Sequence, residues 1–126
     1  MRIDTQLVRL RKERGWTAYT DDPDALRKGF ENSLLILAAY EGEQLLGLIR
    51  IVGDGYTVVW IQDILVYPEY QRKGIGSSLI QAVLARYRQV RQIELATDNT
   101  PKTIAFYESQ GFRRLSELGC CAFMRV

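Results

Sequence analysis

The most informative chemistry in the sequence lies in a basic, glycine-containing loop between a predicted strand and a predicted helix. Residues 71–77 read Gln-Arg-Lys-Gly-Ile-Gly-Ser. The N–H groups in the first turn of a helix have no partner within that helix, and the helix dipole favours an anion there. Gly74 and Gly76 remove side chains that would keep an anion away from the backbone. Arg72 and Lys73 add positive charge, so the loop predicts a binding site for phosphate or pyrophosphate.

Two common phosphate-binding loops do not fit this spacing. A P-loop reads Gly-x-x-x-x-Gly-Lys-Ser/Thr, and the sequence lacks that pattern here. A dinucleotide-binding loop reads Gly-x-Gly-x-x-Gly, whose last glycine would fall at Leu79. The strands expected before the loop also follow one another through short turns, whereas a dinucleotide-binding fold alternates strands with helices.

The absence of histidine limits the catalytic groups. It removes the commonest general base and the commonest metal ligand, and it excludes a Ser-His-Asp or Cys-His site. The two cysteines, Cys120 and Cys121, are adjacent, and we expect them to be small buried apolar groups in a C-terminal strand. No ordinary zinc site can form from such a set, so the expected chemistry needs no metal.

Composition and charge limit the partners. The 126 residues carry 17 Lys and Arg against 15 Asp and Glu, and a net charge of +2 provides no general field for nucleic acid. The longest apolar run, 34–40, is shorter than the roughly 20 residues of a membrane span, and residues 1–6 lack a signal-peptide pattern. We expect one cytoplasmic domain, with neither nucleic acid nor a membrane as partner. The arginines interpreted as solvated surface are Arg86, Arg88, Arg91, Arg113 and Arg114.

One central sheet is expected to hold these features. Apolar runs at 34–40, 44–52 and 57–66 are separated by short glycine-containing turns, which predicts an antiparallel meander. Apolar residues at helical spacing from Gly76 to Tyr87 predict an amphipathic helix after the loop. Three more helices are expected. The first covers 4–14 and is closed by Gly15, the second is opened by Asp22 and Pro23 with Leu26 and Phe30 on its apolar side, and the third covers 103–109 between Pro101 and Gly111. The other expected strands are 93–96 and one or two within 112–126.

Two segments together resemble the motifs of the GNAT superfamily of acetyl-CoA-dependent N-acetyltransferases. Residues 71–76 match the pattern Gln/Arg-x-x-Gly-x-Gly/Ala, and residues 99–112 are similar to the block Asn-x-x-Ala-x-x-x-Tyr-Glu-x-x-Gly-Phe. The resemblance implies an α+β (mixed α/β) fold over residues 1–126, with a mostly antiparallel sheet of about six strands flanked by about four helices. Only residues 1–4 precede the first helix pattern, so the first strand is short or missing.

The resemblance implies transfer of an acetyl group from acetyl-CoA to a primary amine, directly within a ternary complex. No cysteine lies in either motif, so a covalent acyl-enzyme has no obvious nucleophile. The acceptor would be a small-molecule or peptide amine that the sequence does not identify, and a homodimer is left open. A non-catalytic module that binds or senses acyl-CoA on the same fold is the alternative.

The resemblance also assigns roles to individual residues. The loop would hold the pyrophosphate of acetyl-CoA, and the backbone of the preceding strand would bind the pantetheine arm as an added strand. Tyr107 would protonate the thiolate of departing CoA, which suits a phenol with an ordinary pKa of about 10. The family asparagine aligns with Thr100, and either Thr100 or the neighbouring Asn99 takes its role. The implied cofactor contacts are Ile64, Leu65, Val66, Gln71, Arg72, Lys73, Gly74, Ile75, Gly76, Ser77, Asn99 and Phe106.

With no histidine in the sequence, a carboxylate that acts directly or through water is the candidate for taking the proton of the amine. Asp63 lies inside the apolar strand 57–66, where a charged residue needs a reason. One interpretation is a functional role, as the base or as an anchor for the substrate. The other is a structural role, in a salt bridge or in a hydrogen bond to a turn. Glu94 is a weaker candidate for the base. Four aromatic residues from the region that borders the acceptor in this family either pack in the core or a lid, or line a cleft for a flat or hydrophobic amine: Trp16, Tyr19, Phe30 and Tyr40.

Overall fold

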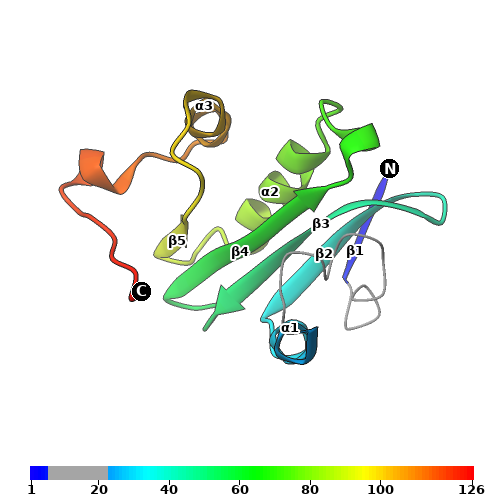
Figure 1. Ribbon diagram of the computed structural model, residues 1–126, viewed down its shortest axis with the longest axis horizontal. Coiled ribbons are helices and arrows are strands. Elements are labelled where there is room, and N and C mark those ends of the chain that lie inside the picture. The colour runs from blue at the N-terminus through cyan, green and yellow to red at the C-terminus, as the bar shows by residue number, and fades with distance from the viewer. Residues whose placement is uncertain (6–22) are drawn as a thin grey trace. The chain divides into compact units, whose positions relative to one another are not determined.

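The computed structural model describes residues 1–5 and 23–126. These residues form five strands, three α-helices and two short 3-10 helices (Figure 1). The chain divides into two compact units, Met1–Ala96 and Thr97–Val126. In chain order the elements are β1 (Arg2–Thr5), α1 (Pro23–Glu31), β2 (Leu35–Glu41), β3 (Gln44–Gly53), β4 (Val58–Val66), a 3-10 helix (Pro68–Tyr70), α2 (Ile75–Arg86), β5 (Gln92–Leu95), α3 (Pro101–Ser109) and a second 3-10 helix (Leu115–Leu118).

The first unit is built on one sheet whose strand order follows the chain, β1-β2-β3-β4-β5. The pairings from β1 to β4 are antiparallel, and β4 pairs with β5 in parallel. The expected α+β fold with a mostly antiparallel sheet is therefore confirmed. β5 runs parallel to β4 because α2 provides the crossover that parallel neighbours require.

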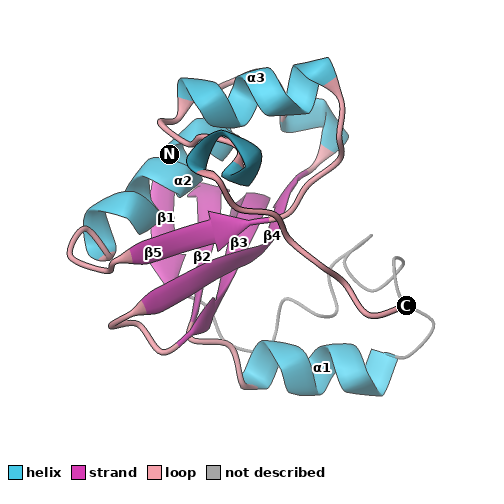
Figure 2. Ribbon diagram, turned by 90° about the vertical axis from the view of Figure 1, so that its left-hand side faces the viewer, coloured by secondary structure: helices cyan, strands magenta, loops and turns pink. Residues whose placement is uncertain are grey.

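Helices cover both faces of this sheet, with α1 on one side and α2 on the other (Figure 2). Burial from both sides explains why residues 35–39 of β2 form a continuous apolar run without alternation. Each large apolar side chain that is fully buried contributes about 1.5–3 kcal/mol. The buried cluster on the α1 side comprises Leu26, Phe30, Ile36, Ala38, Leu45, Leu48 and Tyr67, and the fully buried side chains of α2 are Leu79, Ile80 and Val83.

β4 carries one residue more than β3 near its centre. Arg50 lies opposite Asp63, but the next residue of β3, Ile51, lies opposite Ile61. Gln62 therefore has no residue opposite it and forms a β-bulge. A bulge bends the strand and increases its local twist.

The edge of β4 that faces β5 loses its strand partner at the bulge. β4 pairs with β5 over residues 58–61 alone, while its pairing with β3 continues to Val66. Residues 62–66 therefore have no strand partner on the β5 side among the described residues. Alternate residues of a strand point their N–H and C=O groups to opposite edges, so part of this backbone is open to a ligand.

The chain starts with a strand, and the helix expected from residue 4 is wrong at its first two positions. Asp4 and Thr5 belong to β1, which pairs antiparallel with β2, because the edge of β2 offers partners for their backbone groups. The first strand is thus short, with four residues. The rest of the 4–14 pattern, Gly15 and the expected N-cap Asp22 lie outside the described residues.

The strand or strands expected within 112–126 are wrong. The described chain there has a 3-10 helix, Leu115–Leu118, and Gly119 follows it in a left-handed conformation with φ 77°. Phe123 and Met124 are 93% and 82% exposed, so no apolar layer covers an extended segment. Apolar residues do not make a strand unless a second strand pairs with them. The described sheet therefore has five strands rather than the larger number expected.

The expected burial of Cys120 and Cys121 is also wrong. Both thiols are free and exposed. The burial was inferred from the C-terminal strand pattern, and without that strand there is no inner face for them to occupy. The described α-helices number three where about four were expected, since nothing is described between Thr5 and Pro23.

Gly47 lets β3 approach the end of β4 closely. A Cβ atom added at Gly47 would lie 2.6 Å from the Leu65 carbonyl oxygen and 3.2 Å from Val66 Cα. We expect Gly47→Ala to push the two strands apart and to lower the free energy of unfolding by about 1–3 kcal/mol. Urea denaturation measures this loss.

Gly29→Ala is the matched control for that substitution. A Cβ atom at Gly29, in α1, would lie 3.7 Å from its nearest atom, on Arg50. Alanine is also the better helix former by about 1 kcal/mol, so this variant should be at least as stable as the wild type. Unchanged stability of Gly47→Ala would contradict the close approach of the strands.

Candidate active site

The segment between β4 and α2 folds back against the end of the strand. The backbone N–H of Tyr67 still donates to β3, and the chain then turns through the 3-10 helix Pro68–Tyr70. The side-chain amide of Gln71 donates to the carbonyl oxygen of Val66 at 3.1 Å. The loop 72–76 is thereby held between the open edge of β4 and the start of α2.

Two residues of this loop have a left-handed backbone. Gly74, the N-cap of α2, has φ 80°, and Arg72 has φ 64°. Among the described residues Arg72 alone has a positive φ without being glycine, and this conformation costs about 1–2 kcal/mol. Left-handed residues in a turn bring successive N–H groups to one side, which makes a concavity for an anion.

The backbone N–H groups of the loop are open within the described part of the chain. The first hydrogen bond of α2 runs from Ser78 N to Gly74 O at 3.0 Å, and the N–H groups of 72–76 donate none. The side chains of Arg72 and Lys73 are exposed at the same place. A row of open donors beside two cations has the chemistry that an anion such as phosphate requires, and the phosphate site stays a prediction.

Asp63, a candidate base, forms an ion pair in the structure. Its Oδ2 accepts a hydrogen bond from Arg50 Nε at 2.7 Å, and the Arg50 and Asp63 side chains are 11% and 14% exposed. Arg50 Nη1 also donates to Ser33 Oγ at 3.1 Å and to Gly29 O at 3.3 Å. Its Cζ lies 5.0 Å from the centre of the Phe30 ring. Of the two interpretations of Asp63 that the sequence leaves open, this contact corresponds to the salt bridge.

In the second unit, α3 begins at Pro101 with Thr100 as its N-cap. The Thr100 hydroxyl accepts a hydrogen bond from Thr103 N at 3.3 Å, so that oxygen already caps the helix. Asn99 is exposed, and its side chain forms no hydrogen bond with the described residues. Of the two candidates for the family asparagine, Asn99 is the one whose side chain is left for a ligand.

Tyr107 lies on α3 between two aromatic rings. Its ring meets Phe106 edge to face at 5.1 Å and Phe112 at 6.0 Å between ring centres. Burial raises the pKa of Tyr107 above its usual value, and a hydrogen bond with the Thr97 side chain opposes that rise. The phenol therefore keeps its proton at neutral pH and can act as a proton donor.

The remaining candidates lie in different surroundings. Phe30 is 3% exposed and Tyr40 packs against the same cluster, so both contribute to the core on the α1 side. Glu94 lies on β5 with a half-buried side chain. Trp16 and Tyr19 lie outside the described residues.

The described residues contain no group of three or more His, Cys, Asp or Glu side chains that could bind a metal, and no described helix has the length and apolar character to cross a bilayer. A groove of about 550 Å³ is lined by Gly55, Tyr56 and residues 85–90, at the C-terminal end of α2. It is separate from the loop 72–76, which lies at the N-terminal end of that helix.

Sequence reasoning missed Arg50 and the bulge at Gln62. Arg50 is a single charge inside an apolar strand, which is the same signal that singled out Asp63. Two opposite charges inside neighbouring strands of a predicted hairpin could have been paired from the sequence. The bulge has no comparable signal, because it depends on which residues of the two strands meet.

The fold and the loop define a class of acetyltransferase. A family model described as the acetyltransferase (GNAT) family matches residues 5–112, and the chain belongs to this family. An uncharacterised ycf52-like N-acetyltransferase of Prochlorococcus marinus is 31% identical over 104 residues, which cover 78% of this chain and 57% of that protein. The chain spans about half the length of such curated relatives, 57% of this one and 48% of a ycf52 N-acetyltransferase of Gracilaria tenuistipitata.

Solved structures show the same fold. A GNAT family acetyltransferase from Streptococcus pneumoniae TIGR4 is 38% identical, with a TM-score of 0.90 over 99% of this chain and 96% of that chain. AAC(6′)-Iy, in complex with the bisubstrate analogue CoA-S-monomethyl-acetylneamine, is 17% identical, with a TM-score of 0.74 over 99% and 97% of the two chains. The second likeness concerns the fold alone.

The ion pair between Arg50 and Asp63 generates a prediction about stability. Arg50→Met leaves the carboxylate of Asp63 without its partner in a largely buried position, so the free energy of unfolding should fall by about 3–5 kcal/mol. The double variant Arg50→Met/Asp63→Leu replaces both charges by apolar groups and should recover most of that loss. Urea denaturation of the single and double variants measures both effects.

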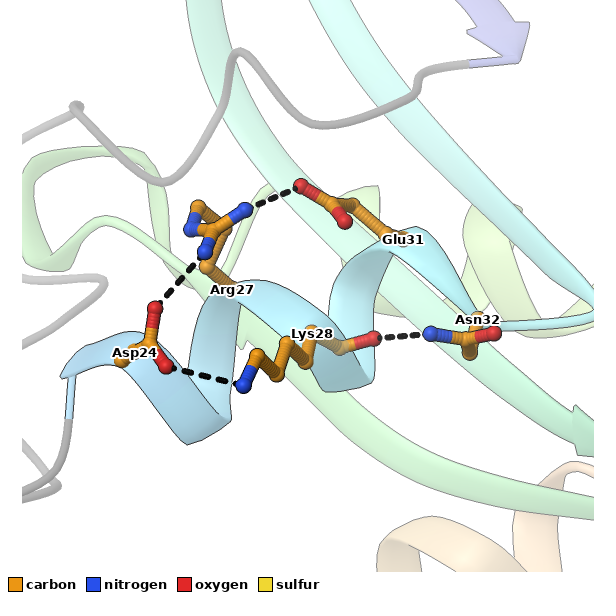
Figure 3. A network of polar contacts seen from close by, with 5 residues as sticks. All are labelled: Asp24, Arg27, Lys28, Glu31 and Asn32. Carbon is orange, nitrogen blue, oxygen red and sulfur yellow. Dashed lines mark hydrogen bonds and ion pairs between the residues drawn. The ribbon is translucent and has the colours of Figure 1, made fainter.

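Arg27→Met is the matched control, since it breaks ion pairs on the exposed surface of α1. Arg27 contacts Asp24 at 2.7 Å and Glu31 at 2.8 Å, and Lys28 contacts the same Asp24 (Figure 3). Solvent screens such pairs, so this variant should lose much less stability than Arg50→Met. Equal losses in the two variants would show that the inner ion pair is no more important than the exposed ones.

Proposed function

We propose that the protein transfers an acetyl group from acetyl-CoA to a primary amine, directly within a ternary complex. The observation that carries this proposal is that two open backbone surfaces follow one another, the edge of β4 at 62–66 and the loop 72–76. An extended amide-containing arm can add to the first as a strand, and a pyrophosphate can accept hydrogen bonds from the second. Acetyl-CoA carries both groups, and it is the donor typical of this family.

The residues proposed to hold acetyl-CoA belong mostly to these two surfaces. The backbone of β4 would pair with the pantetheine arm; the carbonyl of Val66 also accepts from Gln71 and keeps a second lone pair. Asn99 and Phe106 are added by the family motif in the second unit. The proposed contacts are Ile64, Leu65, Val66, Gln71, Arg72, Lys73, Gly74, Ile75, Gly76, Ser77, Asn99 and Phe106.

Tyr107 is assigned the role of general acid. When the amine nitrogen bonds to the acetyl carbon and the carbon–sulfur bond breaks, the sulfur leaves as a thiolate that needs a proton. The Tyr107 hydroxyl donates it, because the raised pKa of the phenol keeps the proton in place until the thiolate forms. The phenolate then regains a proton from solvent.

The amine must lose a proton before it can attack. The carboxylates of Asp63 and Glu94 are the candidates, either directly or through a water molecule. Asp63 adjoins the bulge next to the open edge, but its Oδ2 already accepts a hydrogen bond from Arg50. This contact supports an anchoring role for Asp63 more strongly than a role as base.

The proposed reaction uses residues from both units. The loop belongs to Met1–Ala96 and Tyr107 to Thr97–Val126, so residues 1–126 are proposed to act as one acetyltransferase domain. The acceptor is proposed to be a small-molecule or peptide primary amine. Solved structures that share the fold include an aminoglycoside acetyltransferase in complex with sisomicin, which supports small amines as a first panel.

Calorimetry followed by a thiol-release assay tests the proposed function. Calorimetry establishes whether the protein binds CoA and acetyl-CoA, and the assay follows free CoA thiol across a panel of primary amines. Binding with amine-dependent thiol release supports the enzyme. Binding without release for any amine favours a non-catalytic acyl-CoA module, and absence of binding contradicts both.

Gly76→Val should weaken acetyl-CoA binding. The substitution places an isopropyl group in the first turn of α2, beside the open N–H groups, and blocks the approach of a phosphate. We expect calorimetry to show at least ~10-fold weaker binding, a loss of about 1.4 kcal/mol. Ala85→Val, at an exposed position of the same helix, is the control for adding a β-branched side chain to α2 and should bind as the wild type does. Equal affinities of the two variants would argue against the loop as the phosphate site.

Tyr107→Phe should lower kcat by about 10²–10⁴-fold while acetyl-CoA affinity and thermal stability stay near wild type. The substitution keeps the ring between Phe106 and Phe112 and removes the hydroxyl group, with the proton that it would donate and its hydrogen bond with Thr97. Tyr56→Phe is the control. Tyr56 is 84% exposed in the turn between β3 and β4, so loss of its hydroxyl should leave kcat unchanged. If Tyr107→Phe keeps more than roughly half of kcat while chemistry limits the rate, Tyr107 is a packing residue.

A further inference from the structure

We propose that Arg50 is a positioning residue for acetyl transfer, because it holds the β-bulge at Gln62, where the reacting end of the donor would lie. The proposal rests on the proposed function. Arg50 itself needs no contact with either substrate. Its effect passes through Asp63 and the backbone of β4.

The guanidinium of Arg50 joins three parts of the first unit. It donates to Asp63 in β4 at 2.7 Å, to Gly29 O near the end of α1 at 3.3 Å, and to Ser33 Oγ in the following turn at 3.1 Å. The central carbon of the guanidinium, Cζ, lies 5.0 Å from the centre of the Phe30 ring. A guanidinium is planar and its donors have fixed directions, so these contacts orient Asp63 more rigidly than a flexible ammonium would.

The ion pair lies directly at the bulge. Arg50 and Asp63 lie opposite each other on one side of the register shift, and Gln62 is the extra residue. A shift of the bulge from Gln62 to Asp63 would place Gln62 opposite Arg50 and take Asp63 out of register with it. Two largely buried charges would then lose their partners, which is unfavourable. Arg50 therefore opposes movement of the bulge toward Val66, the direction from which the donor arm would come.

The bulge also marks the far end of the open edge. The loop 72–76, which is the proposed phosphate site, follows β4 in the chain. An acetyl-CoA molecule that adds to β4 as a strand therefore runs from Val66 back toward Gln62. The pantetheine arm has roughly a dozen chain atoms, about as many as the backbone of four residues. Because each residue of a strand spans about 3.3 Å, the extended arm is about as long as four residues of β4. The thioester at its end therefore falls close to the bulge. The backbone conformation at Gln62 and Asp63 then decides where the acetyl group sits.

Removal of the guanidinium should affect turnover more than donor binding. A reacting group displaced by about 1 Å can lose roughly 10²-fold in rate. We expect Arg50→Met to lower kcat by about that factor, while the Kd of acetyl-CoA stays within about 3-fold of wild type because the loop 72–76 is intact. Arg50→Lys keeps the charge but places all its donors on one nitrogen, whereas Arg50 uses Nε for Asp63 and Nη1 for Ser33 and Gly29, so its kcat should lie between those of the wild type and Arg50→Met.

The double variant Arg50→Met/Asp63→Leu separates positioning from stability. An apolar pair should restore resistance to urea, because no buried charge is left without a partner. It should not restore kcat, because neither side chain makes the hydrogen bonds to α1 and to the turn. Recovery of kcat together with stability would overturn the proposal, since Arg50 would then serve folding alone.

Asp63→Asn distinguishes positioning from base catalysis. The asparagine carbonyl can still accept from Arg50 Nε, so a positioning role predicts a smaller loss of kcat than that of Arg50→Met. A base role predicts the reverse order, because an amide cannot take a proton and the loss would be about 10²–10⁴-fold. That reverse order would overturn the proposal.

Hydrogen exchange of the unliganded full chain gives a readout that is independent of turnover. Arg50→Met should speed exchange at residues 62–64 relative to α2, and Arg27→Met should match the wild type in both exchange and kcat. Unchanged exchange in Arg50→Met would overturn the proposal. If the wild type neither binds acetyl-CoA nor releases thiol, the proposed function fails; wild-type turnover with an unaffected Arg50→Met defeats the positioning role alone.

Discussion

β4 has to be a central strand along one half of its length and an edge strand along the other. Its first half lies between β3 and β5, and from Gln62 onward β3 alone accompanies it among the described strands. Backbone N–H and C=O groups at such an edge need water or a ligand as partner. The proposed acetyl-CoA site rests on this half-open strand together with the open N–H groups of the loop 72–76 that follows it.

The open, basic loop 72–76 could be predicted from the sequence because its requirements are local. Two glycines, two cations and a helix start stand within 72–76, and the structure adds the left-handed conformation of Arg72. The strands of the meander were predictable for a similar reason, since each is an apolar run between turns. The bulge was not, because it depends on which residues of β3 and β4 lie opposite one another in the folded sheet.

The second unit shows the same division between local and non-local signals. Pro101 and Gly111 bound α3 as local breakers do, and the structure has that helix. A strand within 112–126 could not be judged from its own residues, because pairing requires a second strand. The role proposed for Tyr107 rests on the family motif, and the structure adds the raised pKa of its phenol.

The backbone of Arg72 places two kinds of selection in conflict. A left-handed arginine costs the folded protein about 1–2 kcal/mol that glycine or asparagine would largely avoid. A library screened only for heat resistance should therefore enrich glycine or asparagine at this position, and each would remove a cation from the loop. A library screened for affinity toward a phosphate-bearing donor should keep the arginine. Thermal stability and phosphate binding thus favour different residues at position 72, because both depend on its left-handed φ.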